Sequence, residues 1–301
     1  MIIVVGSLNM DLVTKTEKVP KVGETFLGVD FKQAAGGKGA NQADAIAKLG
    51  GKVAMIGRVG DDQFGESLIN GLKADGVEVS HIHVTKSTST GIATIIVNGD
   101  GDNSIIVVPG ANFKLMPTDI DEAEEMIEKS HIMIAQMEVP LDTIKYAFKK
   151  AKQYGKYTIL NPAPARVLDE ELLQMTDLLV PNETELEILS QRTLETQEDM
   201  LLVAKELMLK GIKEIIVTLG ANGCLHIDKT TSTHYPAQLV KAVDTTAAGD
   251  SFIGAMATAF SEGKSLKEAI GFASKVSALS VTRQGAQESL PTKKEVEDYK
   301  S

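Results

Sequence analysis

Short apolar runs recur along the chain and alternate with amphipathic stretches. The first run is Ile2–Val5, which ends at Gly6, and similar runs follow at 53–56, 132–135, 158–160, 178–180 and 215–218. Short β-branched runs bounded by glycine or polar residues are typical of buried strands. Helical stretches lie between most of them, at 119–129, 141–153 and 197–209. This alternation predicts βαβ units, and therefore a mostly parallel sheet with helices on both faces.

Two regions depart from this rhythm, at about 13–32 and about 91–108. Both have strand patterns without an intervening helix, and the second contains the turn sequence Asn98-Gly99-Asp100-Gly101-Asp102, a strong hairpin signal. They predict a small separate sheet. After Gly249 the pattern becomes helical, at 250–262 and 265–281, and no internal repeat or low-complexity linker divides the chain.

Composition excludes several classes of protein. The 301 residues contain 31 Lys and Arg against 41 Asp and Glu, a net charge of −10, and no basic cluster that would bind nucleic acid. No apolar run approaches the roughly 18 residues of a membrane helix, and the first residues lack a secretory signal pattern. Cys224 is the only cysteine, which excludes an internal disulfide, fits a cytoplasmic protein and predicts a buried side chain.

Two short motifs resemble ligand sites but lack required residues. Gly263-Lys264-Ser265 resembles the end of a phosphate-binding loop, yet Thr258 stands where its first glycine is needed, so we expect a turn between helices. The segment from Asp100 resembles a calcium loop, but Ile105 occupies its glycine position. The five histidines show no zinc-site spacing. These patterns predict neither a calcium site nor a catalytic transition metal.

A glycine-rich segment carries the first chemical signal. Gly36, Gly37 and Gly39 surround Lys38, and Asn41 follows at the start of an expected helix. Glycines expose backbone N–H groups that can face a ligand. A tight strand-to-helix turn would explain one or two of these glycines, but not the Lys and Asn set among them.

A second signal lies at residues 244–250, where small residues precede Asp250 at an expected helix start. Unpaired N–H groups and the helix dipole attract a phosphate there, and the carboxylate beside them can accept a proton. Simple helix capping is the alternative, since Asp is a common cap.

Taken together, the two segments resemble the two signatures of the PfkB carbohydrate kinase family, and most closely its members that phosphorylate D-ribose. The supporting segments occur in the expected order over nearly the whole chain, at 6–11, 36–42, 136–138, 181–185, 217–220, 244–250 and 281–286. The resemblance implies a single domain over 1–301. Its fold would be a ribokinase-like three-layer α/β/α core with a mostly parallel sheet, and the strands at 13–32 and 91–108 would form a small lid.

The resemblance also implies roles for individual residues. Asp250 would be the catalytic base for transfer of the ATP γ-phosphate to the sugar's 5-hydroxyl, and it would also contact both substrates. The matching sugar-binding positions are Asn9, Asp11, Gly37, Lys38, Asn41 and Glu138. Without the resemblance, Asn9 and Asp11 could be caps after a strand, and Glu138 a solvated charge.

On the nucleotide side, Asn182 and Glu185 match a motif associated with the Mg²⁺-bearing phosphates, although an exposed helix face would look the same. The positions matching the ATP loop and its surroundings are Thr218, Leu219, Gly220, Ala221, Asn222, Gly223, Gly249 and Ser274. A monovalent cation, usually K⁺ in this family, would order the loop before Asp250. The matching positions are Asp244, Thr246, Ser280, Arg283, Gly285 and Ser289.

Three positions depart from the family pattern. Ala247 stands where the wider family usually has Gly, Asp44 where an apolar or small residue is usual, and Ser274 where Asn or His is common near the adenine. Two rivals remain: a kinase of the same family acting on deoxyribose, fructose or a nucleoside, and a catalytically silent regulator that binds sugar or nucleotide. The resemblance further implies a homodimer formed through the lid.

Overall fold

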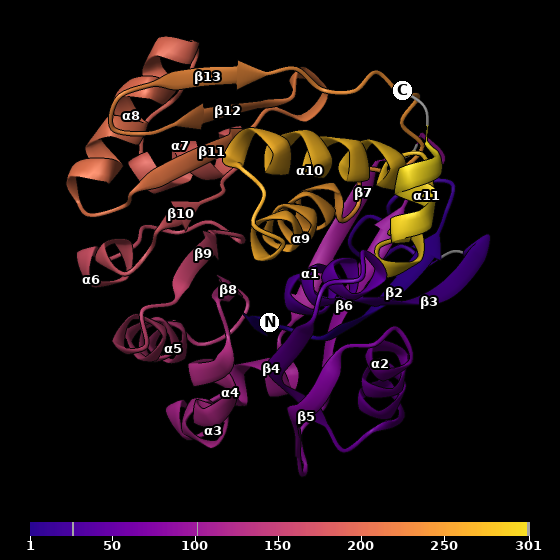
Figure 1. Ribbon diagram of the computed structural model, residues 1–301. Helices are drawn as coiled ribbons and strands as arrows, with labels where there is room; N and C mark the ends of the chain where they lie inside the picture. The colour runs from indigo at the N-terminus through magenta and orange to yellow at the C-terminus, as the bar shows by residue number, and fades with distance from the viewer. Residues whose placement is uncertain (26, 101, 300–301) are drawn as a thin grey trace.

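The computed structural model describes residues 1–25, 27–100 and 102–299. Within them nine strands form the central sheet, in the order β13-β12-β11-β10-β9-β8-β1-β4-β5 (Figure 1). Neighbouring strands run parallel except at β11–β12 and β12–β13, which are antiparallel. The predicted mostly parallel sheet is therefore confirmed. The strands are β1 (Ile2–Val5), β4 (Val53–Gly60), β5 (Glu78–Thr85), β8 (Ile132–Gln136), β9 (Tyr157–Asn161), β10 (Leu178–Leu179), β11 (Glu214–Thr218), β12 (Cys224–Ile227) and β13 (Ser232–Tyr235).

Alternating side chains of the buried strands supply two separate cores. Ile2 and Val4 of β1 pack into one apolar cluster, whereas Ile3 and Val5 pack into the other. A strand that is apolar at every position requires cover on both faces, which helices provide here. The first cluster is covered by α1 (Lys38–Lys48), α2 (Gln63–Ala74), α9 (Ala248–Ser261), α10 (Leu266–Ser280) and α11 (Lys293–Asp298). The second is covered by α3 (Pro117–Glu122), α4 (Glu124–Lys129), α5 (Leu141–Gln153), α6 (Glu170–Gln174), α7 (Glu183–Ser190) and α8 (Gln197–Leu209).

The helix bounds agree with the sequence pattern for α5 and α8, while the stretch predicted at 119–129 differs. It forms two short helices, α3 and α4, which meet at Ala123. No glycine or proline marks this break. The turn from Gly263 to Ser265 connects α9 with α10, and the Ser265 side chain caps α10, as predicted for a turn between helices.

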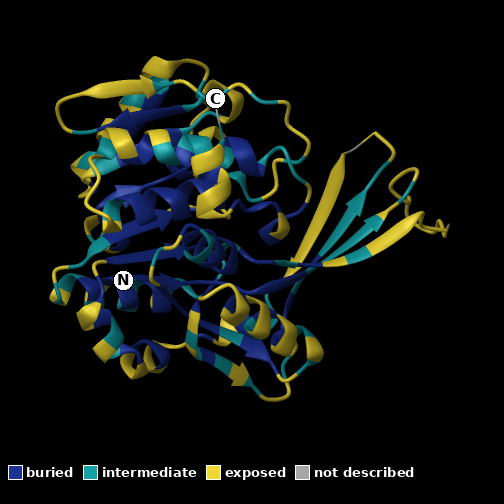
Figure 2. Ribbon diagram, turned by 45° about the vertical axis from the view of Figure 1, so that its right-hand side comes forward, coloured by how far each residue is buried: buried dark blue, intermediate teal, exposed yellow. Residues whose placement is uncertain are grey.

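A second sheet stands apart from the central one. Its order is β3 (Asp30–Gly36), β2 (Asn9–Lys15), β6 (Gly91–Val97) and β7 (Asn103–Val108), and only β2 and β6 run parallel. Figure 2 shows it projecting from the body of the molecule with exposed outer strands. The predicted separate sheet is confirmed. However, the region expected at 13–32 forms strands only at its two ends, and Phe26 and the turn residue Gly101 lie outside the described residues.

Two further findings concern burial and helix length. Cys224 is buried in β12, as predicted, and burial raises the pKa of its thiol to about 12. Among the helices of the described residues, none combines the length and apolarity that a membrane crossing requires.

Helix α1 carries a carboxyl group into the core. Asp44 is fully buried and pairs with Lys48 one turn later, at 2.9 Å. Lys48 Nζ also lies 3.7 Å from Asp75 and donates to the Gln287 carbonyl at 2.7 Å. Burial outweighs the attraction of Lys48 and raises the pKa of Asp44 to about 7. The departure from the family pattern at this position is therefore a buried, paired acid.

Asp44 should make the protein less stable as the pH rises. The folded chain keeps the Asp44 proton up to about pH 7, whereas the ordinary pKa is 3.8, so between these values the folded state binds more protons and the free energy of unfolding falls with pH. In Asp44→Asn this fall between pH 5 and pH 8 should be smaller by about 2 kcal/mol, measured by urea unfolding. Asp30→Asn, at an exposed position of β3, is the control. An equal pH slope in Asp44→Asn and the parent would contradict the argument.

Helix α9 begins at a strained residue. Its N-cap, Ala247, has φ +59°, in the left-handed region that side chains with a Cβ avoid. This backbone conformation forms the turn that opens α9, and the alanine adopts it at an energetic cost.

Relieving that strain should stabilise the fold. Ala247→Gly is expected to raise the free energy of unfolding by about 1 kcal/mol, because glycine adopts a positive φ freely. Ala248→Gly, one residue later and inside the helix, should instead lower it by about 0.5 kcal/mol. Urea unfolding of both variants measures the contrast, and a loss of stability in Ala247→Gly would refute the strain.

Candidate active site

Two cavities meet at the N-terminus of α9. The smaller, of about 170 Å³, is lined by polar residues that include Lys38, Asn161, Glu185 and Asp250. The larger, of about 380 Å³, extends along the start of α9 and the side of α10 and is mainly apolar. Both are lined by Asn182, Thr218, Thr245, Ala248 and Gly249. The site is therefore a polar chamber that opens into an apolar groove.

Asp250 lies at the centre of this arrangement. It is buried in the first turn of α9, with 6% of its surface exposed. Asn41 Nδ2 donates to its Oδ2 at 3.0 Å, and Gln42 Nε2 donates to its Oδ1 at 2.9 Å. The glycine-rich segment and the Asp250 segment, which are about two hundred residues apart in sequence, are thus in direct contact.

Glycines permit this contact on both helices. A Cβ on Gly254 of α9 would lie 2.7 Å from the Ala45 Cβ of α1, so only glycine allows the helices to approach this closely. Gly37 has φ +90°, and a Cβ there would lie 2.7 Å from the Asn9 backbone nitrogen. The close approach of backbone at these points sets the position of the first turn of α1 beside Asp250.

Two further carboxyl groups lie near Asp250. Glu138, which follows β8, accepts hydrogen bonds from the Ser7 hydroxyl and, at 3.1 Å, from the Lys38 backbone N–H. On β2, burial raises the pKa of Asp11 to about 7, with a further contribution from the charges of Glu138 and Asp250. The Asp11 carboxylate accepts no hydrogen bond from the residues that the structure describes, so it is available to a ligand.

Lys38 balances this negative charge. Burial opposes its ionisation, but the surrounding carboxylates outweigh that effect and raise the pKa of the ammonium. Those carboxylates belong to Asp250, Glu138 and Glu185. Lys38, Glu185 and Asp250 line the chamber, whereas Glu138 acts on Lys38 from outside that lining.

Asn9, the first residue of β2, does not line the chamber, and its side chain has a partner within the protein. Its Oδ1 accepts a hydrogen bond from Asn112 Nδ2 at 2.7 Å, and Asn112 also bonds to the Leu8 backbone. A Cβ on Gly91 would lie 2.2 Å from both side chains. Asn112 is thus a supporting residue that the sequence pattern did not indicate.

Asn182 and Glu185 form a capping box at the start of α7. Asn182 Oδ1 accepts from the Glu185 N–H at 2.7 Å, and Glu185 Oε2 accepts from the Asn182 N–H at 2.9 Å. Burial raises the pKa of Glu185. Both residues line the chamber, and Glu185 Oε1 accepts no hydrogen bond from the described part of the chain. The pair therefore caps the helix and still offers a carboxylate oxygen to the cavity.

The predicted ATP loop lines the larger groove only in part. Thr218, Gly220, Ala221 and Gly223 line it, as does Ser274 of α10. Leu219 instead packs against the apolar core, and the Asn222 carbonyl is hydrogen-bonded by His234 at 2.7 Å. Within the expected set, these two positions therefore turn away from the groove, whereas Phe252 and Leu239 add apolar lining that was not anticipated.

The predicted cation positions gather in one loop cluster. Asp244 Oδ1 accepts from the Thr246 N–H and hydroxyl, and Asp244 Oδ2 accepts from the Gly285 N–H at 2.9 Å. The hydroxyls of Ser280 and Ser289 lie 2.8 Å apart. The Arg283 guanidinium is directed to Glu295, so only its backbone could serve a cation.

Among the described residues, no group of three or more His, Cys, Asp or Glu side chains is arranged to hold a metal ion. A divalent ion in this chamber would take some of its ligands from a bound substrate or from water.

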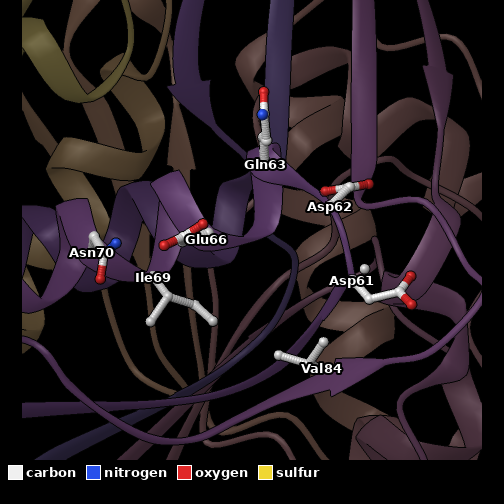
Figure 3. Close-up of a pocket in the computed structure, with 8 residues that line it drawn as sticks. Asp61, Asp62, Gln63, Glu66, Ile69, Asn70 and Val84 are labelled. Carbon is white, nitrogen blue, oxygen red and sulfur yellow. The ribbon is translucent and has the colours of Figure 1, made fainter.

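A further cavity, of about 500 Å³, contains none of the predicted site residues. It lies beside α2 and β5, where Figure 3 shows the carboxylates of Asp61, Asp62 and Glu66. Asp62 caps α2 through the Gly65 N–H and also accepts from Thr90, so its oxygens hold the fold together. The polar side chains that converge on one point lie around Asp250 instead.

Comparison with known proteins agrees with this geometry. Residues 1–293 match the model of the pfkB family carbohydrate kinases. The chain is 42% identical to the deoxyribokinase of Salmonella typhi, covering 100% of this chain and 98% of that protein, and 40% identical to the ribokinase of Haemophilus influenzae, covering 98% and 97%. The structure of Arabidopsis thaliana ribokinase complexed with ribose and ATP superposes with a TM-score of 0.92 at 34% identity, covering 98% of this chain and 96% of that one. The predicted family and fold are confirmed: this chain belongs to the pfkB family of carbohydrate kinases.

Proposed function

We propose that this protein transfers the γ-phosphate of ATP to the 5-hydroxyl of D-ribose, giving D-ribose 5-phosphate and ADP. One observation carries the proposal: the Asp250 carboxylate lies where a carboxylate-lined chamber joins an apolar groove, at the N-terminus of α9. A sugar suits the carboxylate-lined chamber, and a nucleotide suits the apolar groove. The solved relative that holds ribose and ATP supports this pairing.

The reaction would use Asp250 as the general base. Its carboxylate accepts the proton of the sugar's primary hydroxyl as that oxygen forms a bond to the γ-phosphorus, and the bond from phosphorus to the leaving ADP oxygen breaks. The N–H groups at the start of α9, including that of Gly249, would stabilise the charge that develops on the phosphoryl oxygens. No covalent intermediate on the enzyme is needed.

Sugar recognition would rest on Lys38, which lines the chamber, and on polar groups near it. Asp11 has free acceptor oxygens for sugar hydroxyls, and Asn41 and Lys38 supply donors near the same point. Gly37, Glu138 and Asn9 complete the proposed sugar contacts; Asn9 already accepts a hydrogen bond from Asn112. A site that pairs hydroxyls in this way disfavours a sugar that lacks one, because its own polar groups would remain unpaired.

We further propose Mg²⁺ as the ion that accompanies ATP and K⁺ as an activator. Mg²⁺ would neutralise part of the phosphate charge, and the free Oε1 of Glu185 faces the chamber in which it would act, largely through water. Because the Asp244 oxygens already accept hydrogen bonds, K⁺ would depend mainly on backbone oxygens of the loop cluster around residues 244–246 and 283–289. It would order the turn before Asp250.

A panel of sugars tests the substrate. Ribose, 2-deoxyribose, fructose and adenosine are compared by coupled ADP detection, and ribose should give the highest kcat/KM, because the deoxy sugar leaves one polar partner unpaired. Asp250→Asn is the matched control and should lower kcat at least a hundredfold with all sugars while ribose binding persists. A preference for deoxyribose would reassign the substrate. Full turnover by Asp250→Asn would remove the proposed base, and no turnover by the parent with any sugar would favour a silent binding protein.

The small sheet also supports a homodimer. Its outer strand β7 exposes Ile105, Ile106, Val107 and Val108, and Phe31 of β3 is exposed as well. An apolar, open-edged sheet of this kind is typical of a surface that pairs with another chain. We propose that the sheet covers the sugar chamber as a lid and pairs with the same sheet of a second copy.

A charge placed on this surface should separate the copies. Light scattering of the parent should give twice the chain mass of 32.2 kDa, whereas Ile106→Lys should give the single mass, because a lysine cannot be buried in an apolar interface without a partner. Val84→Lys, at a residue of β5 that is also exposed, should remain a dimer. A monomeric parent, or an unchanged mass for Ile106→Lys, would contradict the interface.

A further inference from the structure

Both oxygens of the Asp250 carboxylate are held by side-chain amides, and each of these amides is held in turn by a glutamine. Gln42, which donates to Asp250 Oδ1, accepts at its own Oε1 a hydrogen bond from Gln136 Nε2 at 2.6 Å. Asn41, which donates to Asp250 Oδ2, accepts at its Oδ1 a hydrogen bond from Gln287 Nε2 at 3.4 Å. Two parallel amide chains therefore end at one carboxylate.

An amide side chain has two chemically opposite ends. Its NH₂ group donates and its carbonyl oxygen accepts, and rotation by half a turn exchanges them with almost no change in shape. If the carbonyl oxygen of Gln42 faced Asp250, two acceptors would meet and repel. A donor on the far side of each amide opposes this rotation, because it occupies the oxygen and leaves the NH₂ group toward the carboxylate. For Gln42, Asn161 Oδ1 opposes it as well, since it accepts from the same Nε2 at 3.3 Å.

Gln136 and Gln287, the outer glutamines of the two amide chains, are well placed to oppose this rotation. Gln136 is fully buried at the end of β8, where Gly6 makes room for it: a Cβ on Gly6 would lie 2.2 Å from Gln136 Oε1. Gln287 is 8% exposed, and its backbone carbonyl oxygen accepts a hydrogen bond from Lys48 Nζ at 2.7 Å. Neither side chain has a direct hydrogen bond to Asp250 among the described residues.

We infer that Gln136 and Gln287 are positioning residues for the phosphoryl transfer, which fix the amides of Gln42 and Asn41 so that both donate to Asp250. This inference rests on the proposed role of Asp250 as base. The two donors orient the carboxylate and favour its ionised form, the form that accepts a proton. Gln136 acts through Gln42, and Gln287 acts through Asn41.

The charged groups that face Asp250 are Lys38 of α1, Glu185 of α7 and Asp11 of β2. Glu138, after β8, acts on the same Lys38 and Asp11. Substitutions of the outer glutamines leave all four in place. A change in the pH profile caused by such a substitution is therefore attributable to the amide chains.

The experiment compares Gln136→Met, Gln42→Met and the double variant. Methionine keeps the length of the side chain and removes its donors and acceptor. Gln136→Met should lower kcat about tenfold with the KM for ribose changed less than threefold, and the acid limb of the kcat profile should move to higher pH by about half a unit. Because Gln136 acts through Gln42, the double variant should be no slower than Gln42→Met alone. If the losses of kcat in the two single variants added up in the double variant, the inference that Gln136 acts through Gln42 would be overturned.

A second arm keeps the test decisive if Gln136→Met does not fold. Gln287→Met should show the same kcat loss and the same displacement of the acid limb, whereas Gln153→Met, at an exposed position on α5, should match the parent. Parental kcat and pH profiles in the folded glutamine variants would refute the inference while Asp250→Asn stays inactive. If Asp250→Asn were itself fully active, the proposed function would fail instead, so the two failures are distinguishable.

Discussion

The contact between α1 and α9 is the constraint on which the site depends. Asp250 is buried at the start of α9, and the ordering of its carboxylate comes from Asn41 and Gln42 on the first turns of α1. The helices reach this separation because Gly254 presents no side chain to Ala45. A buried carboxylate without such donors would be strongly disfavoured in its ionised form. The packing of two helices thus sets the direction of the group proposed to accept the proton.

The small sheet and the central sheet each place a carboxyl group near the chamber. Asp11 comes from the small sheet, whereas Glu138 follows a strand of the central sheet, and the charge of Glu138 acts on both Asp11 and Lys38. Burial raises the pKa of Asp11 to about 7, whereas the pKa of Lys38 is raised by the surrounding carboxylates against the opposing effect of burial. The site is therefore poised so that a polar ligand with several hydroxyls can replace water among groups that have few partners of their own.

Several features could be predicted from sequence because they depend on local pattern. The bounds of α5 and α8 follow from helical periodicity, and the buried strands follow from apolar runs of three or four residues. The break between α3 and α4 at Ala123 has no such signal, since neither glycine nor proline occurs there. Gln136 lies in a segment that carries the family resemblance, but its role was not predicted, and Asn112 was not indicated at all. The role of an amide in a strand or turn cannot be assigned until its hydrogen-bond partner is known.

The sequence by itself determined the alternation of strands and helices, the family signatures around Gly37 and Asp250, and the types of chemical group that the site contains. Only the tertiary structure decided which of these groups touch. It brought Gln287 into contact with Asn41, 246 residues away in sequence. It also directed the Arg283 guanidinium to Glu295, away from the loop cluster of the predicted cation site. The reason is physical: periodicity reports which face of an element is buried, whereas hydrogen bonds between distant elements depend on how closely their backbones pack.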